Sequence, residues 1–181
     1  STGHGVPGAF MSLLNTAFLN EAINEKKIAR PNEVLDYVRQ RLIKNISKDA
    51  GQDAMDGILF CFDLVNRKVS YAAAHNAPII IRDGNVIELE ADKMPIGVGV
   101  RDEPFTLHEI DLKENDILIA YTDGFADQFG GPNGKKFKYK QLKEILANGN
   151  QMPFDEQKEK LSRVFEKWKG DLEQVDDVCV I

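Results

Sequence analysis

Apolar residues recur with helical spacing over the first third of the chain. After Pro7, which a first helical turn tolerates, the apolar series runs through Phe10, Leu13, Leu14, Ala17, Phe18 and Ala22. A second series follows Pro31 and consists of Val34, Leu35, Val38, Leu42 and Ile46. These two patterns predict two consecutive helices, each with one apolar face.

The period of the pattern then changes from that of a helix to that of β-strands. The apolar runs predict strands over 57–64, 69–74, 78–81, 86–89, 105–112 and 116–122. Asp83-Gly84 lies between two of these short runs and is a hairpin signal. Because short turns join the strands and no crossover helix separates them, the sheet should be largely antiparallel.

Helical spacing returns near the C-terminus, over 139–147 and again over 155–168. The second of these helices has a predicted buried stripe of Leu161, Val164, Phe165 and Trp168. The chain ends in a short predicted strand over 178–181. Helices first, antiparallel strands in the middle and helices last indicate an α+β fold with helices packed on sheet faces.

Length and charge narrow the possibilities further. At 181 residues with 43% apolar residues, the chain suits one globular domain, 1–181. Its formal net charge of -6 argues against nucleic-acid binding, which requires a basic stripe. A phosphorylated substrate stays possible, because a bound cation reverses the local field of an acidic pocket.

The chain shows no signal peptide and no apolar stretch long enough to span a membrane, so this domain is expected to be cytoplasmic and to make no membrane contact. It begins with Ser1, which suggests a piece of a longer parent that carries an upstream sensor or membrane region. Cys61 and Cys179 lie in apolar runs without Cys-x-x-Cys spacing. We expect both to be buried free thiols in a reducing compartment.

Three spots carry candidate chemistry, each just outside a predicted strand or helix. The glycine-rich residues 1–5 lead into the first helix, whose N-terminus favours an anion, although such a loop is also a common helix entry. Asp123 follows a strand in Thr122-Asp123-Gly124, and a helical turn would place Asp127 on the same side. The pair Asp176-Asp177 precedes the terminal strand. Each acid could equally be a solvated turn residue, but a set of oxygen ligands suits Mg²⁺ or Mn²⁺.

The order of these motifs resembles that of the PPM-type metal-dependent serine/threonine phosphatases, and most closely their bacterial SpoIIE-like branch. The matching segments are Gly3-His4-Gly5-Val6-Pro7-Gly8-Ala9, Tyr71-Ala72-Ala73-Ala74-His75-Asn76-Ala77-Pro78, Met94-Pro95-Ile96-Gly97, Thr122-Asp123-Gly124 and Asp176-Asp177-Val178-Cys179-Val180-Ile181. The resemblance extends from the first residue to the last. It implies an α-β-β-α sandwich of two antiparallel sheets flanked by helices, with metal ions at one end.

By position, the resemblance implies that Asp123 and Asp176 are carboxylate ligands of a centre holding two Mg²⁺ or Mn²⁺ ions. Asp127 resembles an acid that helps to hold a further, weaker metal in some relatives. The carbonyl of Ser1 matches a backbone ligand. His4 lies beside the metals, where it shapes the loop or shuttles a proton. His75 is expected to be structural first and to line the site second.

The resemblance implies a phosphoserine/phosphothreonine protein phosphatase of bacterial signalling, acting on a phosphorylated protein. In the family pattern Asp-x-x-Gly-His-Gly, a bridging Asp would stand directly before Ser1, so the chain is expected to be N-terminally incomplete and nearly inactive alone. The alternative is a phosphatase-like module with a degenerate centre, kept for binding or regulation. The residue preceding Ser1 would decide between these two hypotheses.

Overall fold

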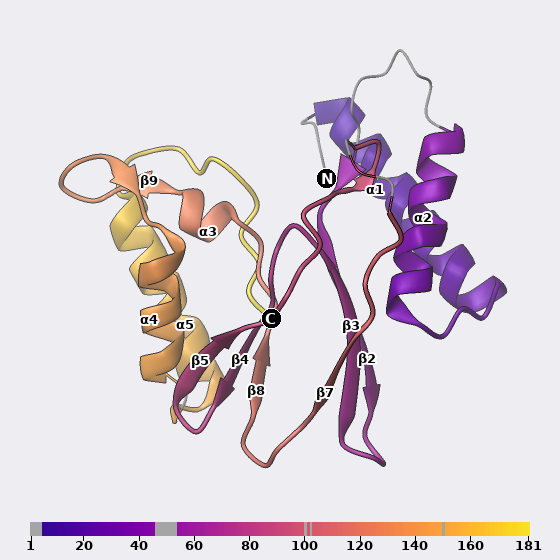
Figure 1. Ribbon diagram of the computed structural model, residues 1–181. Helices are drawn as coiled ribbons and strands as arrows, with labels where there is room; N and C mark the ends of the chain where they lie inside the picture. The colour runs from indigo at the N-terminus through magenta and orange to yellow at the C-terminus, as the bar shows by residue number, and fades with distance from the viewer. Residues whose placement is uncertain (1–4, 46–53, 100, 102, 150) are drawn as a thin grey trace. The chain divides into compact units, whose positions relative to one another are not determined.

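The computed structural model describes residues 5–45, 54–99, 101, 103–149 and 151–181, which form helices and small antiparallel sheets (Figure 1). By their internal contacts these residues fall into two compact units. The first unit comprises Ser1–Ala77 with Glu90–Lys113, and the second comprises Pro78–Leu89 with Glu114–Ile181. Each unit has a hydrophobic core of its own.

The first unit begins with the two predicted helices. They are α1 (Gly5–Asn20), which continues as a π-helical turn over Glu21–Glu25, and α2 (Pro31–Asn45). In α1 the residues that enter the core are Met11 and Phe18, whereas Phe10 and Leu13 face outward. The buried side of α2 is Val34, Leu35, Val38 and Leu42, as its apolar pattern predicts.

Two antiparallel sheets complete the first unit. The larger has the strand order β2-β3-β7 and consists of β2 (Gly57–Asp63), β3 (Lys68–Ala74) and β7 (His108–Asp111). The smaller pairs β1 (Ala54–Met55) with β6 (Ile96–Gly97). Helix α2 packs against β2, β3 and β6. All the strand pairs in these two sheets are antiparallel, which confirms the predicted pairing.

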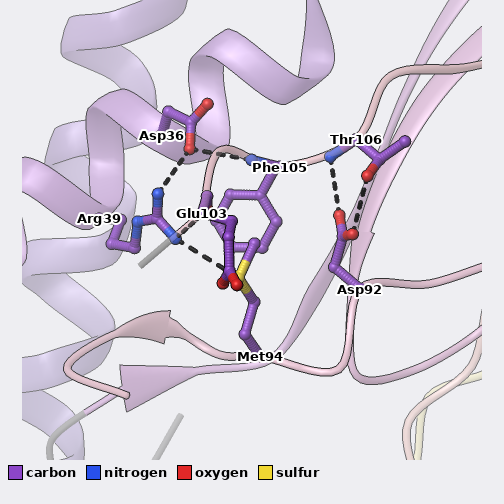
Figure 2. A network of polar contacts seen from close by, with 7 residues as sticks. All are labelled: Asp36, Arg39, Asp92, Met94, Glu103, Phe105 and Thr106. Carbon is purple, nitrogen blue, oxygen red and sulfur yellow. Dashed lines mark hydrogen bonds and ion pairs between the residues drawn. The ribbon is translucent and has the colours of Figure 1, made fainter. Parts of the chain in front are cut away.

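A buried arginine fastens the segment before β7 to α2 (Figure 2). The guanidinium of Arg39 donates to Asp36 Oδ1 at 2.9 Å and to the carbonyl of Glu103 at 2.9 Å. Asp36 Oδ1 also accepts the backbone N–H of Phe105 at 3.1 Å, and the carboxylate of Asp92 accepts the N–H of Thr106 at 2.8 Å. The backbone N–H groups of Phe105 and Thr106 thus donate to carboxylates and not to a neighbouring strand. The predicted strand over 105–112 therefore shortens to β7.

The second unit contains a three-stranded antiparallel sheet with the order β5-β4-β8. Its strands are β4 (Ile79–Arg82), β5 (Asn85–Glu88) and β8 (Ile117–Ile119). The predicted Asp83-Gly84 hairpin is confirmed, since Arg82 pairs with Asn85 across it and both turn residues have positive φ, 51° and 76°. Positive φ at both positions is the signature of a type I′ turn, which matches the twist of the strands.

After β8 the second unit becomes mainly helical. Its further elements are α3 (Gly124–Asp127), β9 (Phe129–Gly130), β10 (Lys135–Lys136), α4 (Tyr139–Gly149) and α5 (Phe154–Lys169). Helices α4 and α5 lie side by side (Figure 1). The predicted stripe of α5 is confirmed: Phe165 is buried, and Leu161, Val164 and Trp168 pack against the same core. Phe165 meets Phe125 of α3 edge-on, with ring centroids 5.1 Å apart.

The cysteine prediction is half wrong. Cys61 and Cys179 are free thiols, as expected, but both are exposed. Cys61 is one of the last three residues of the edge strand β2, and all three are exposed. Cys179 lies in the C-terminal segment, where its carbonyl accepts the N–H of Thr122. An apolar run therefore did not imply burial at these two positions. Within the part of the chain that the structure describes, no helix has the length and apolar character needed to cross a bilayer.

Candidate functional site

Asp123 stands where β8 has ended and the short helix α3 begins. The strand leads through Tyr121 and Thr122 into Asp123, which has helical backbone angles and precedes the first residue of α3. The N–H of Asp127 donates to the carbonyl of Asp123 at 2.9 Å, which closes the predicted helical turn between the two acids. The backbone turn expected between Asp123 and Asp127 is therefore present, and residues four apart in such a turn have their Cβ atoms on the same side of it.

The C-terminal residues pair with the segment that carries Asp123. Ala120 and Ile181 exchange two backbone hydrogen bonds of 3.0 and 2.9 Å, and the N–H of Thr122 donates to the carbonyl of Cys179 at 3.0 Å. Tyr121 and Val180 form a single antiparallel bridge. The predicted terminal strand is thus present only as this bridge, but its register carries the acids Asp176 and Asp177 toward Asp123.

The side chain of Thr122 fixes the acid pair from its C-terminal side. Its hydroxyl donates to the carbonyl of Asp177 at 2.8 Å and accepts the N–H of Cys179 at 2.9 Å. In addition, Asp176 Oδ1 accepts the N–H of Asp177 at 2.7 Å, which orients the carboxylate of Asp176. These bonds hold the backbone beside Asp123 in a defined conformation.

Gly124 shows how closely the two segments approach. A Cβ atom at this position would lie 2.4 Å from the carbonyl oxygen of Asp177 and 3.2 Å from the carbonyl carbon of Asp176. Any residue with a side chain would have to displace the facing backbone. The start of α3, directly after Asp123, is therefore in backbone contact with the acid pair, so the structure brings together the two backbone segments that carry Asp123 and Asp176.

Asp127 has a different partner. Its carboxylate lies 2.9 Å from Nζ of Lys136 on β10, and the same ammonium lies over the ring of Phe129. Both charged side chains are close to half-exposed, so solvent screens this ion pair. Asp127 would have to exchange Lys136 for a metal ion to serve as a ligand.

Two carboxylates from adjoining segments are a suitable but partial donor set for Mg²⁺ or Mn²⁺. Among the described residues, no three or more His, Cys, Asp or Glu side chains gather closely enough to hold a metal ion. Mg²⁺ in proteins commonly takes one or two carboxylates and keeps several waters, so Asp123 and Asp176 fit that demand. The other predicted members of the site, Ser1 and His4, lie outside the described residues.

His75 lies at the end of β3 in the first unit, in an unusual backbone conformation. Its φ is 61°, and the N–H of Asn76 donates to the carbonyl of Ala74 at 2.7 Å across it, which makes a tight turn that non-glycine residues rarely adopt. The ring is held by Asp56, whose Oδ1 lies 2.8 Å from Nδ1. These contacts agree with the structural role expected for His75.

Burial changes the pKa of Tyr121, which lies between the end of β8 and Asp123. Tyr121 is 6% exposed, and this burial, with a smaller effect of the Glu88 carboxylate, raises the pKa of its phenol to about 12. The phenol is therefore neutral over the physiological range. Tyr121 contributes packing beside the site and no charge.

Sequence reasoning missed Gln128, which follows directly after Asp127. Its side chain is fully buried and bonds to the backbone on both sides of Gln174, in the segment that leads to Asp176. A glutamine after a short helix carries no sequence signal for such a role, because its partners lie 45 and 47 residues away along the chain.

Comparison with known proteins finds one matching protein family and several similar solved structures. The sequence profile of the family described as "Stage II sporulation protein E (SpoIIE)" matches residues 1–181. Among curated proteins, none matches the chain.

Several solved structures resemble the chain over nearly its whole length. The SiaA-PP2C domain of Pseudomonas aeruginosa is 29% identical, with a TM-score of 0.89 over 99% of this chain and 70% of that one. The RsbU and RsbW domains of a Mycobacterium tuberculosis protein are 19% identical, with a TM-score of 0.76 over 99% of this chain and 48% of that one. The phosphatase domain and regulatory fragment of SpoIIE from Bacillus subtilis are 20% identical, with a TM-score of 0.71 over 99% of this chain and 51% of that one.

The structural matches confirm the predicted fold class. Similarity at 19% and 20% identity supports the fold alone, and that fold is the α+β PP2C type with helices and antiparallel sheets. The chain spans about half the length of these two relatives.

Proposed function

The chain belongs to the SpoIIE family of PP2C-type phosphatase domains, and from this premise we propose that it is a Mg²⁺- or Mn²⁺-dependent protein phosphatase acting on phosphoserine or phosphothreonine in bacterial signalling. The observation that carries the proposal is the contact between two backbone segments that are distant in sequence and each carry a candidate acid. Asp123 and Asp176 lie on segments joined by Thr122 and by the contact of Gly124 with Asp177. Oxygen ligands brought together in this way are what a hard divalent cation requires.

Each residue in the proposed centre has a distinct task. Asp123 and Asp176 would hold the cations, and Thr122 keeps the backbone around Asp176 in place. When bound, two such ions supply an activated water and neutralise the charge on the phosphoryl oxygens. No protein nucleophile is then needed, and the proposal assigns no role to Cys61 or Cys179.

The remaining assignments follow from family membership and stay proposals. Ser1 is proposed as a backbone ligand, and His4 as a loop residue that shuttles a proton. Asp127 is proposed as a ligand for a further, weaker metal. Because Lys136 already neutralises Asp127, we expect that metal to bind more weakly than the ions at Asp123 and Asp176.

The substrate is proposed to be a phosphorylated protein, and the parent chain to carry a sensor upstream of this domain. One relative combines RsbU and RsbW domains in a single protein, which supports a setting in which such phosphatase domains work beside other regulatory domains. The proposed location is the cytoplasm. Residues 1–181 are proposed to act as one phosphatase domain.

Hydrolysis of a phosphoserine peptide by the full-length protein, with Mn²⁺ present, tests the function. We expect Asp123→Asn and Asp176→Asn each to lower kcat/KM by at least about 100-fold, because loss of an outer-shell partner alone costs about 10–100-fold. Asp155→Asn, at an exposed position of α5, is the matched control and should retain activity.

Two outcomes would count against the proposal. If the three variants hydrolyse the peptide equally well, the acids have no role in the reaction. If the wild-type protein binds Mn²⁺ and a phosphopeptide but releases no phosphate, the degenerate binding module is the correct description.

A further inference from the structure

Among the residues that the structure describes near the candidate centre, Gln128 has the most deeply buried polar side chain. It follows α3 directly, is completely buried, and lies among backbone groups of the C-terminal segment. Its Nε2 donates to the carbonyl of Glu173 at 3.0 Å and to that of Phe129 at 3.0 Å. Its Oε1 accepts the N–H of Val175 at 3.2 Å. The amide of Gln128 is thus hydrogen-bonded to the backbone of Glu173 and of Val175, shortly before Asp176.

The backbone around Gln128 is anchored as firmly as its side chain. The carbonyl of Gln128 accepts the indole N–H of Trp168 at 3.0 Å and the N–H of Phe137 at 3.0 Å. The N–H of Gly131 donates to the carbonyl of Trp168 at 2.8 Å. A Cβ at Gly130 would lie only 1.8 Å from that carbonyl oxygen, so the contact is as close as a backbone allows. Gln128 is therefore a fixed point from which the C-terminal segment can be positioned.

The acid pair lies between two such attachment points. On its N-terminal side, Gln128 holds Glu173 and Val175, and on its C-terminal side, Thr122 holds Asp177 and Cys179. Both attachments extend from the stretch that contains Asp123. The hydrogen bonds of Gln128 and of Thr122 together set the position of Asp176 relative to Asp123. A segment attached at one end alone would keep more conformational freedom.

We propose that Gln128 is a positioning residue that sets the position of Asp176 relative to Asp123, the two proposed metal ligands. This inference rests on the proposed function. Glu173 and Val175 are exposed, so water can replace the amide at their backbone groups if the side chain is changed. Loss of the amide should then loosen the segment and weaken metal binding while most of the fold persists. A purely structural glutamine would show the opposite pattern, with stability lost and metal affinity retained.

The test compares Gln128→Met with Gln157→Met in the full-length protein. Methionine matches the length of glutamine and lacks its hydrogen-bonding groups. Gln157 also gives its amide to a backbone carbonyl of the second unit, that of Met152 at 2.9 Å, but away from the acid pair. We expect Gln128→Met to raise the Mn²⁺ dissociation constant by about 10–100-fold, as loss of an outer-shell partner does. Gln157→Met should leave it unchanged.

Two further measurements separate positioning from simple loss of structure. In Gln128→Met, excess Mn²⁺ should restore kcat, whereas it cannot restore kcat in Asp123→Asn, which lacks a ligand. In the wild-type protein, hydrogen exchange at the Val175 amide should be protected and should slow further when Mn²⁺ binds. This second measurement needs no variant, so it decides the matter even if Gln128→Met fails to fold.

The outcomes distinguish this inference from the proposed function. An unprotected Val175 amide, or equal Mn²⁺ affinity in folded Gln128→Met and wild-type protein, overturns the role of Gln128 alone. If the wild-type protein binds no Mn²⁺, the proposed function fails and the positioning role fails with it. Weaker Mn²⁺ binding by Gln128→Met, with kcat restored at high Mn²⁺, supports both.

Discussion

Replacing Gly124 with alanine should force apart the two segments that carry the candidate ligands. The added Cβ would lie 2.4 Å from the carbonyl oxygen of Asp177, whereas ordinary contacts begin near 3.4 Å, so the segment must retreat by about 1 Å. The bond from the Thr122 hydroxyl to that oxygen, now 2.8 Å, would then lengthen beyond hydrogen-bonding range. The clash meets backbone atoms, which cannot rotate away as a side chain would.

The energetic consequence follows from these distances. Overpacking of this kind costs about 1–3 kcal/mol, and the lost hydrogen bond costs about 1 kcal/mol. Alanine is a better helix former than glycine and returns about 0.5–1 kcal/mol. We therefore expect the free energy of unfolding to fall by roughly 1–3 kcal/mol, measured by urea denaturation. Mn²⁺ affinity, measured by calorimetric titration, should fall as well, because the displaced backbone carries Asp176.

Gly149→Ala is the matched control for this prediction. At Gly149, in the last turn of α4, an added Cβ would meet its nearest neighbour at an ordinary 3.6 Å. We expect this variant to be neutral or slightly stabilised and to bind Mn²⁺ as the wild-type protein does. If Gly124→Ala behaves like Gly149→Ala in both measurements, the close contact beside Asp123 does not exist in solution.

Two further predictions concern charged and titratable groups of the second unit. Because burial raises the pKa of Tyr121 to about 12 while an unfolded tyrosine titrates near 10, the stability due to its neutral phenol is complete below about pH 10 and is lost as the pH rises toward 12. The loss should approach roughly 2 kcal/mol, and alkaline denaturation of Tyr121→Phe should lack it; superimposable pH profiles would contradict this. Asp116, with a side chain only 3% exposed, binds Arg82 through two hydrogen bonds of 2.9 and 2.6 Å. Thermal or urea unfolding should show that Asp116→Asn costs about 3 kcal/mol, against less than about 0.5 kcal/mol for Asp111→Asn in an exposed pair, and equal costs would refute the importance of burial.

The helices and the main strands could be predicted because their signals are local. The Asp83-Gly84 turn is an example, since the two residues that need positive φ stand next to each other in the sequence. The first part of the strand predicted over 105–112, before β7, was wrong for the opposite reason. The N–H groups of Phe105 and Thr106 are taken by the carboxylates of Asp36 and Asp92, and such distant partners leave no local pattern.

The candidate site divides in the same way. The ordered motifs identify Asp123 and Asp176, but the meeting of their segments depends on bonds such as that from Thr122 to Asp177, which are 55 residues apart. Local spacing cannot predict such a register. The ion pair of Asp127 with Lys136 was likewise invisible, and so was the burial of Gln128, because polar residues give no apolar pattern.

Anomalous X-ray scattering from crystals of the full-length protein grown with Mn²⁺ is the most direct measurement of the central claim. The account predicts a manganese peak within coordination distance of one carboxylate oxygen of Asp123 and one of Asp176. A fully occupied manganese site that contacts neither residue, or no bound manganese at millimolar concentration, would contradict it.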